Sequence, residues 1–134
     1  MRFEDLRVLL VEENGSLRRQ VGVMLRQVGI QAFDETDSGL SGVDMLRDRQ
    51  PDLLMVGDVP DSGDGIAFAR LVRDEVSASL PIILVAGYAD LWRLGEAKQA
   101  GVTEFLVRPF TTRALIQRLQ RAAAFSRKGA LRVV

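Results

Sequence analysis

Four short segments follow apolar runs along the chain and carry residue types that could do chemistry. They are Glu12-Glu13, Gly57-Asp58, Ala86-Gly87 and Arg108-Pro109. Two adjacent carboxylates such as Glu12 and Glu13 repel each other, and a cation beside them relieves that repulsion. Mg²⁺ prefers oxygen ligands of this kind, while the forked guanidinium of Arg108 also pairs with carboxylates. We favour an internal pair between Arg108 and one of these glutamates over a bound metal, for which Glu13 is the candidate ligand.

The absence of two residue types excludes several other kinds of site. The chain has no His and no Cys, so it cannot form a Ser–His or Cys–His catalytic pair, a His or Cys metal site, or a phosphohistidine. The glycine-rich segment 57–65 lacks the Gly-Lys-Ser/Thr ending of a phosphate-binding P-loop. These absences exclude those catalytic, metal-binding and phosphate-binding arrangements.

The composition is typical of one cytoplasmic domain. The 134 residues are 47% hydrophobic and 27% charged, as in single globular domains. No apolar run reaches the ~20 residues of a membrane span, and the acidic start of the chain does not resemble a secretory signal. The lack of Cys agrees with a reducing compartment. We expect neither a membrane nor a nucleic acid as partner.

Charge is unevenly distributed, although the net charge is zero. Residues 1–64 hold 13 acids and 7 bases, whereas residues 65–134 hold 5 acids and 11 bases. No acid follows Glu104, but seven bases do: Arg108, Arg113, Arg118, Arg121, Arg127, Lys128 and Arg132. From this asymmetry alone we favour a solvated basic face that binds nothing. The alternative is an anionic partner near the C-terminal end, such as an acidic protein or an anionic nucleotide messenger.

Alternating strand and helix patterns predict the fold. Five short apolar runs rich in branched residues predict strands. They cover residues 7–12, 31–36, 53–56, 80–86 and 104–107. Apolar residues at helical spacing follow each run. Asp90 is expected to cap the fourth helix, which runs to Ala100-Gly101, and Thr111 or Thr112 the last.

Five strands alternating with helices predict an α/β domain. Its core is a doubly wound parallel sheet with helices on both faces. In such sheets the binding site lies at the carboxyl ends of the strands. The four segments that could do chemistry all follow predicted strands, so we expect them to converge on one cleft.

Six motifs occur in order along the chain. They are Val8–Glu13, Pro51–Leu54, Asp64-Gly65, Leu80–Ile83, Gly87–Asp90 and Ala100–Phe110. On these motifs residues 6–125 resemble the response-regulator receiver domain, the CheY-like phospho-acceptor module of bacterial two-component and phosphorelay signalling. The resemblance implies a flavodoxin-like sheet with strand order 2-1-3-4-5. We assign residues 1–125 to a receiver domain and residues 126–134 to a basic C-terminal tail.

The resemblance also assigns roles to single positions, and this chain departs from the family at most of them. Glu12-Glu13 stands where the family has the acidic pair that holds Mg²⁺. Gly57 stands at the phospho-acceptor Asp, and a glycine has no nucleophile. Ala86 replaces the Ser or Thr that contacts a phosphoryl oxygen, and Arg108 replaces a Lys. The resemblance therefore implies a degenerate receiver, or pseudo-receiver, that has lost phosphoryl chemistry and needs no cofactor.

Asp58 is the alternative phospho-acceptor. With one extra residue in the strand and one fewer in the loop, Asp58 would take the place of Gly57, and an active receiver would use it with Mg²⁺. Successive strand side chains point to opposite faces, so we expect this one-residue shift to turn the carboxylate of Asp58 away from the cleft. We therefore favour a turn role for Asp58.

The resemblance places the usual partner surface on the fourth helix, the fifth strand and the last helix. Trp92 and Phe105 put aromatic side chains there, with Phe105 at the family's aromatic switch position. Arg113, Arg118 and Arg121 add positive charge, and aromatic and Arg residues are enriched in binding hot spots. We expect an acidic protein partner that binds independently of phosphorylation. The alternatives are a homodimer through the same surface and, for Trp92, packing in the core.

Overall fold

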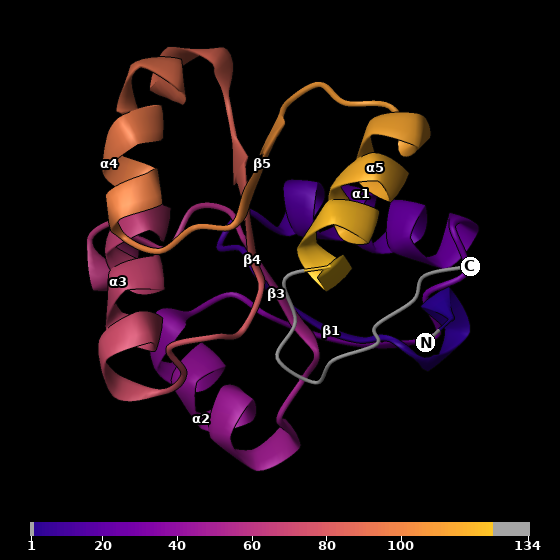
Figure 1. Cartoon of the computed structure of the whole chain (residues 1–134), viewed down its shortest axis with the longest axis horizontal. Coiled ribbons are helices and arrows are strands. Elements are labelled where there is room, and N and C mark those ends of the chain that lie inside the picture. Colours follow the sequence, from indigo (N-terminus) through magenta and orange to yellow (C-terminus); the bar gives the residue numbers. More distant parts are fainter. Residues whose placement is uncertain (1, 125–134) are drawn as a thin grey trace.

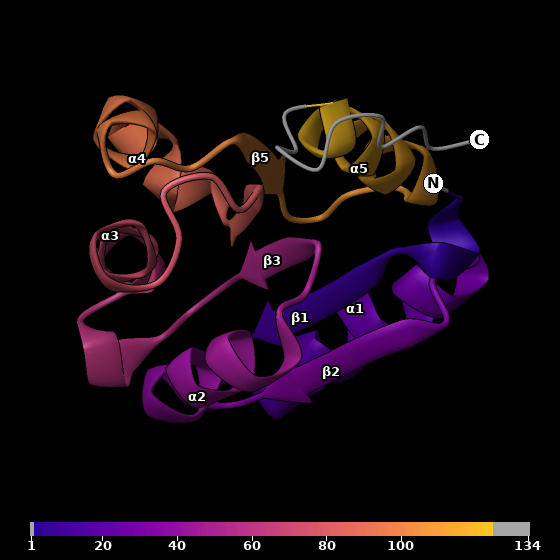
Figure 2. The ribbon, with the colours of Figure 1, turned by 60° about the horizontal axis from the view of Figure 1, so that its bottom comes forward.

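A parallel β-sheet organises the chain in the computed structural model, which describes residues 2–124. Its five strands are β1 (Arg7–Val11), β2 (Ala32–Thr36), β3 (Leu53–Val56), β4 (Ile82–Ala86) and β5 (Glu104–Val107). They lie in the order β2-β1-β3-β4-β5, and each neighbouring pair is parallel. Figure 2 shows β2, β1 and β3 side by side. The doubly wound α/β fold and the 2-1-3-4-5 order are confirmed.

Helices cover both faces of this sheet. Within residues 2–124 they are α1 (Gly15–Gln27), α2 (Gly39–Arg49), α3 (Gly65–Glu75), α4 (Leu94–Gln99) and α5 (Thr112–Ala124). The core on one face includes residues of α1 and α5, and the core on the other includes residues of α2, α3 and α4 (Figure 1). Three short 3₁₀ segments, η1 (Phe3–Asp5), η2 (Pro60–Ser62) and η3 (Tyr88–Arg93), complete the described chain.

The central strands are buried on both faces. Every residue of β3 and β4 is buried, whereas β2 at the edge is only partly buried. Leu10 and Met55 belong to the core that includes α1 and α5, while their neighbours Val11 and Val56 belong to the opposite core. Burial on both faces explains why these strands are unbroken apolar runs in the sequence.

Polar side chains begin the first three helices at the carboxyl edge of the sheet. The side chains of Asn14, Ser38 and Asp64 accept backbone N–H groups in the first turns of α1, α2 and α3. Asp61 in η2 reaches across to α2, where its carboxylate accepts the Gly39 N–H at 2.9 Å. This hydrogen bond outweighs the smaller opposing effect of burial and lowers the pKa of Asp61 below its ordinary value. The loop after β3 is thereby fixed to the start of α2.

The fourth helix begins later than the sequence predicts. Residues Tyr88–Arg93 form a 3₁₀ segment, and the α-helix covers only Leu94–Gln99. Asp90 lies inside the 3₁₀ segment, where its Oδ2 accepts the Gly87 N–H at 3.2 Å. The prediction of Asp90 as an α-helical cap was wrong because an Asp side chain can stabilise such a tight turn by the same local hydrogen bonding. Thr111 caps α5 as predicted, since its Oγ1 accepts the Ala114 N–H.

Three strand ends differ slightly from the prediction. β1 ends at Val11, one residue early, β2 begins at Ala32, one residue late, and β4 begins at Ile82, after Pro81. A proline has no N–H to donate to a sheet, which accounts for the later start of β4. The basic tail, residues 126–134, lies outside the described residues. Among residues 2–124, no helix is long and apolar enough to cross a membrane.

Candidate functional site

A cleft of about 400 Å³ opens at the carboxyl edge of the sheet. Gly57, Asp58, Ala86 and Arg108 all line it. The structure thus brings together three of the four segments singled out in the sequence. Glu12 is buried next to Gly57, with only 2% of its surface exposed. Glu13 is exposed and does not line the cleft.

The buried carboxylate of Glu12 is held by the backbone. Its Oε2 accepts the Asn14 N–H at 2.9 Å, and its Oε1 accepts the Asp58 N–H at 3.2 Å. A buried carboxylate is costly unless hydrogen bonds compensate for lost water. These two donors come from the loops that follow β1 and β3, so Glu12 ties the two loops together.

Gly57 leaves the space that the Glu12 side chain occupies. A Cβ atom built on Gly57 would overlap Oε1 of Glu12 and would lie 2.8 Å from its Cδ. Contacts this close do not occur in real structures, so a side chain at position 57 requires Glu12 to move. The Glu12 side chain thus occupies the space that is left free because Gly57 has no side chain.

Arg18 in α1 is the cation beside the acidic pair. Its Nη1 donates to the carbonyl oxygen of Glu12 at 2.8 Å and to that of Glu13 at 3.2 Å. Its Nε lies 3.5 Å from Oε1 of Glu35 in β2. The sequence analysis missed this residue. A usable signal was present, since Arg18 lies in the first turn and a half of the helix that follows the acidic pair.

The expected pair between Arg108 and Glu12 or Glu13 is absent, although the structure describes all three residues. Instead, the guanidinium of Arg108 lies beside Gly87. Its Nε is buried and has no hydrogen-bond partner among residues 2–124. The prediction was wrong: the Glu12 carboxylate is directed at the Asn14 and Asp58 N–H groups and not at Arg108. The Glu13 side chain is exposed and lies outside the cleft.

The carboxylates of this region do not fit a Mg²⁺ ion as they are arranged. Mg²⁺ requires several oxygen ligands in near-octahedral geometry. Both oxygens of Glu12 accept backbone N–H groups, and Glu13 and Asp58 are exposed. Among the described residues, no group of three or more acidic side chains could hold a metal ion.

Asp58 is one of the residues that line the cleft. β3 ends at Val56, so Asp58 lies in a loop where the alternation of strand side chains no longer applies. Its backbone is fixed on both sides, because its N–H donates to Glu12 and its carbonyl accepts the Glu13 N–H at 2.9 Å. The side chain itself is exposed.

A charged group formed by Arg93, Asp64 and Glu96 borders the cleft. Arg93 lies 2.8 Å from Asp64 through Nη1 and 2.9 Å from Glu96 through Nη2. Burial alone would raise the pKa of Asp64, but the Ala67 N–H and the Arg93 guanidinium together lower it below its ordinary value. Hydrogen bonds to Glu96 and Asp64 raise the pKa of Arg93. Of the two described cations that line the cleft, Arg93 is thus already paired and Arg108 is not.

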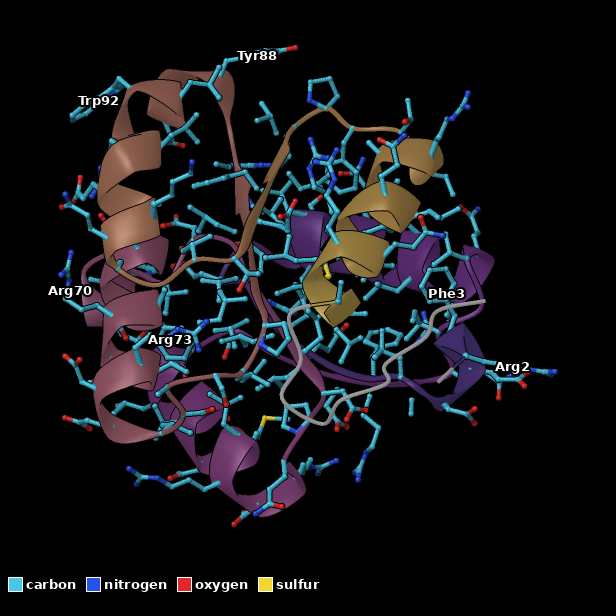
Figure 3. The ribbon with its side chains drawn as sticks, viewed as in Figure 1. Arg2, Phe3, Arg70, Arg73, Tyr88 and Trp92 are labelled. Atoms are coloured by element: carbon cyan, nitrogen blue, oxygen red, sulfur yellow. The ribbon has the colours of Figure 1, made fainter. Side chains whose placement is uncertain are left out.

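The expected partner surface carries exposed aromatic side chains. Trp92 is 81% exposed and Tyr88 is 69% exposed. Figure 3 shows both side chains at the same end of the molecule, pointing outward from η3. Core packing of Trp92, the alternative considered from the sequence, is therefore wrong. Phe105 is partly buried and packs against the core on its side of the sheet.

The arginines of this surface are partly neutralised. The Nε of Arg118 donates to the Phe105 carbonyl at 2.6 Å. Nη1 of Arg121 lies 3.7 Å from the Glu104 carboxylate. Arg113 is exposed and forms no ion pair with any residue in the described range 2–124. Arg113 is therefore the arginine of this surface most available to a partner.

The fold and the cleft at its carboxyl edge define a class of protein, the receiver domain of two-component signalling. The response regulator receiver domain family matches residues 8–120, so the chain belongs to this family.

Two curated relatives cover nearly the whole chain. Chemotaxis protein CheY of Pseudomonas aeruginosa is 31% identical over 117 residues, which are 87% of this chain and 94% of the relative. Chemotaxis protein CheY-3 of Vibrio cholerae is 29% identical over 119 residues, covering 88% and 92% respectively.

Solved structures show the same fold. A response regulator from Chloroflexus aurantiacus superposes with a TM-score of 0.79 at 22% identity, covering 87% of this chain and 96% of that one. The receiver domain of the sensor histidine kinase PA1611 from Pseudomonas aeruginosa, which holds a magnesium ion in its active-site cleft, gives 0.75 at 26% identity, covering 87% and 95%.

Proposed function

We propose that this chain is a pseudo-receiver, a protein-interaction module whose state does not depend on phosphorylation. The observation that carries the proposal is the relationship between Glu12 and Gly57. Position 57 has no nucleophile, and the carboxylate of Glu12 occupies the space in which one would stand. Ala86 provides no hydroxyl group for a phosphoryl oxygen at the opposite wall of the cleft.

The hydrogen bonds of Glu12 give this arrangement one stable state. They connect the loop after β1 to the loop after β3, and Arg18 donates a hydrogen bond to the Glu12 carbonyl of the same turn. A receiver switch requires a second arrangement that a ligand or modification favours. The Glu12 carboxylate already binds the Asp58 N–H in the loop after β3. In this arrangement the loop has a hydrogen-bond partner without a phosphoryl group or other ligand.

The surface proposed for a protein partner is formed by η3, α4, β5 and α5. Trp92 and Tyr88 offer exposed aromatic area, and Arg113 is exposed and forms no ion pair within residues 2–124. Such residues are the usual centres of binding energy in protein interfaces. An acidic protein fits this surface best, and the cytoplasm is the location we propose for the interaction.

One observation favours a second candidate function. Asp58 is exposed and is one of the residues that line the cleft. An active receiver would use Asp58 as the phospho-acceptor, with Mg²⁺ held by Asp58 and Glu13 after both side chains rotate. The magnesium ion in the cleft of the PA1611 receiver supports this reading by analogy. A nucleotide messenger bound by the basic tail is a third prediction, and the tail lies outside the described residues.

Amide NMR spectra of the full chain separate the first two functions. Spectra would be recorded with Mg²⁺ alone and with Mg²⁺ plus beryllofluoride, an analogue of a phosphoryl group on a carboxylate. The pseudo-receiver predicts no saturable shift of the amides of Gly57, Asp58, Ala86 and Gly87. A saturable shift in wild type that disappears in Asp58→Asn would establish the active receiver instead.

A further inference from the structure

A second and larger hollow adjoins the cleft. A groove of about 940 Å³ lies between α1 and the residues that follow β4 and β5. Its apolar lining is formed by Leu17, Val21, Val23, Met24, Pro109 and Phe110. Leu17 and Arg108 line the groove and the cleft alike, so the two hollows meet at these side chains.

The charged residues that line the groove are both cations, Arg19 and Arg108. Neither forms an ion pair with another residue of the described range. The Nε of Arg108 is also buried without a hydrogen-bond partner among those residues. A buried donor without a partner is costly, and native proteins rarely leave one unsatisfied. The Nε itself is buried, but an anionic group in the groove would pair with the positive charge of the Arg108 guanidinium.

The apolar wall of the groove remains partly open to water. Val23 is 50% exposed, and Leu17 and Met24 are only partly buried. Small-molecule sites commonly have volumes of roughly 300–1,000 Å³ and an apolar lining with a few polar groups that fix orientation. The groove has these properties, with Arg108 at one end as the orienting group. Its complement is a molecule with an apolar body and one anionic head.

We propose that this groove binds a small amphipathic anion. Its carboxylate or comparable head group pairs with Arg108, and its apolar body lies along Leu17, Val21 and Met24. Because Arg108 also lines the cleft at the carboxyl edge of the sheet, the bound ligand would contact that edge. This contact requires no side chain at position 57. The proposal goes beyond the pseudo-receiver function and holds whether or not Asp58 accepts a phosphoryl group.

Isothermal titration calorimetry of the full chain with dodecanoate, kept below its micelle concentration, tests the proposal. We expect saturable binding at a single site. The uncharged analogue 1-dodecanol has the same apolar body and should bind about tenfold more weakly or worse, because it cannot form a charge-assisted pair with Arg108. Equal affinity for the two compounds would contradict the assigned role of Arg108.

Two substitutions and two matched controls locate the site. Arg108→Gln removes the charge and Val23→Glu places an acid on an exposed position of the wall, so each should weaken dodecanoate binding by about tenfold. The controls are Arg113→Gln, an exposed arginine outside the groove, and Leu40→Glu, an apolar residue of α2 that is 79% exposed. Both controls should bind within about twofold of wild type. Thermal melts of all four variants verify that they are folded.

Three results would overturn the proposal. The first is no saturable binding of dodecanoate to wild type. The second is wild-type affinity in both Arg108→Gln and Val23→Glu. The third is saturable binding of an acidic amphipathic peptide without binding of dodecanoate, which would assign the groove to a protein partner. None of these results bears on beryllofluoride binding, so failure here and failure of the pseudo-receiver function are distinguishable.

Discussion

The carboxylate of Glu12 fills the space that any side chain at position 57 would need. A Cβ atom on Gly57 would overlap Oε1 of Glu12, and that oxygen is held by the Asp58 N–H. The longer acid fits because a glycine directly follows the neighbouring strand β3. The two residues therefore act as one unit, and a change at either position alters the environment of the other.

Gly57→Ala should lower the free energy of unfolding by about 1–3 kcal/mol, because the new methyl group displaces a packed and hydrogen-bonded side chain. Chemical denaturation measures this effect. Gly95→Ala in α4 is the matched control, since nothing lies within 4 Å of its Cβ position, and it should be neutral or slightly stabilising. In a Glu12→Ala background the cost of Gly57→Ala should largely disappear. Additive effects of the two substitutions would show that the residues are independent.

Arg18, and not Arg108, should contribute to stability at the acidic pair. Arg18→Gln removes hydrogen bonds to the Glu12 and Glu13 carbonyls, and we expect a loss of about 1–3 kcal/mol in the free energy of unfolding. Arg108→Gln should cost less than about 0.5 kcal/mol, because its guanidinium forms no ion pair in the described chain. Urea titrations of the two variants provide the comparison. A larger loss of stability in Arg108→Gln than in Arg18→Gln would support the Arg108–glutamate pair predicted from the sequence.

Asp61 should make the start of α2 sensitive to acid. The Gly39 N–H lowers the pKa of Asp61 below its ordinary value of 3.8. A carboxyl whose pKa is lower in the folded than in the unfolded state stabilises the fold above the unfolded pKa, and this contribution is lost as pH falls through the folded pKa. The Tm of Asp61→Asn should therefore lie below that of wild type at pH 7, and the gap should close below about pH 4.

The control for Asp61 is Asp44→Asn, an exposed acid on α2 that accepts no hydrogen bond from any residue in the range 2–124. Its Tm should follow that of wild type across the same pH range. A gap between Asp61→Asn and wild type that stays constant from pH 7 to about pH 2 would mean that the charge of Asp61 is irrelevant to α2.

The partner surface is best tested at Trp92 and Arg113. Arg118 is unsuitable because it donates to the Phe105 carbonyl, so its replacement would disturb β5. With a partner purified from native lysate, Trp92→Ala should weaken binding by about tenfold or more, as at a hot spot. Arg113→Glu should weaken it more at low salt than at high salt. Arg47→Glu on α2 is the control, and binding that is weakened only by this control would place the partner elsewhere.

Sequence patterns were sufficient for the strands and the position of the cleft, whereas the strand order came from the resemblance to the receiver family. Apolar runs such as Leu53–Val56 are buried on both faces, and this makes them recognisable without a structure. The start of α4 was not predictable from Asp90, because the same local hydrogen bond serves a 3₁₀ turn. Local sequence patterns therefore predicted which helices and strands exist more accurately than the residues at which they begin and end.

Which side chains and backbone groups contact one another within the cleft depends on the three-dimensional arrangement of the loops, which the sequence does not give directly. Whether Glu12 was free to pair with Arg108 depended on backbone N–H groups from two loops, one of them forty-six residues away. The strand alternation used to exclude Asp58 did not apply, because β3 ends two residues earlier and Asp58 lies in the loop. Both errors arose from loop geometry, which tertiary contacts determine.

Phosphoryl transfer to the chain tests the central claim most directly. The full chain would be incubated with acetyl phosphate and Mg²⁺, and its intact mass would be measured beside that of Asp58→Ala treated in the same way. The pseudo-receiver predicts an unchanged mass for both proteins, because Gly57 offers no nucleophile and Glu12 occupies its side-chain space. A stoichiometric gain of one phosphoryl group by wild type that is absent in Asp58→Ala would contradict it.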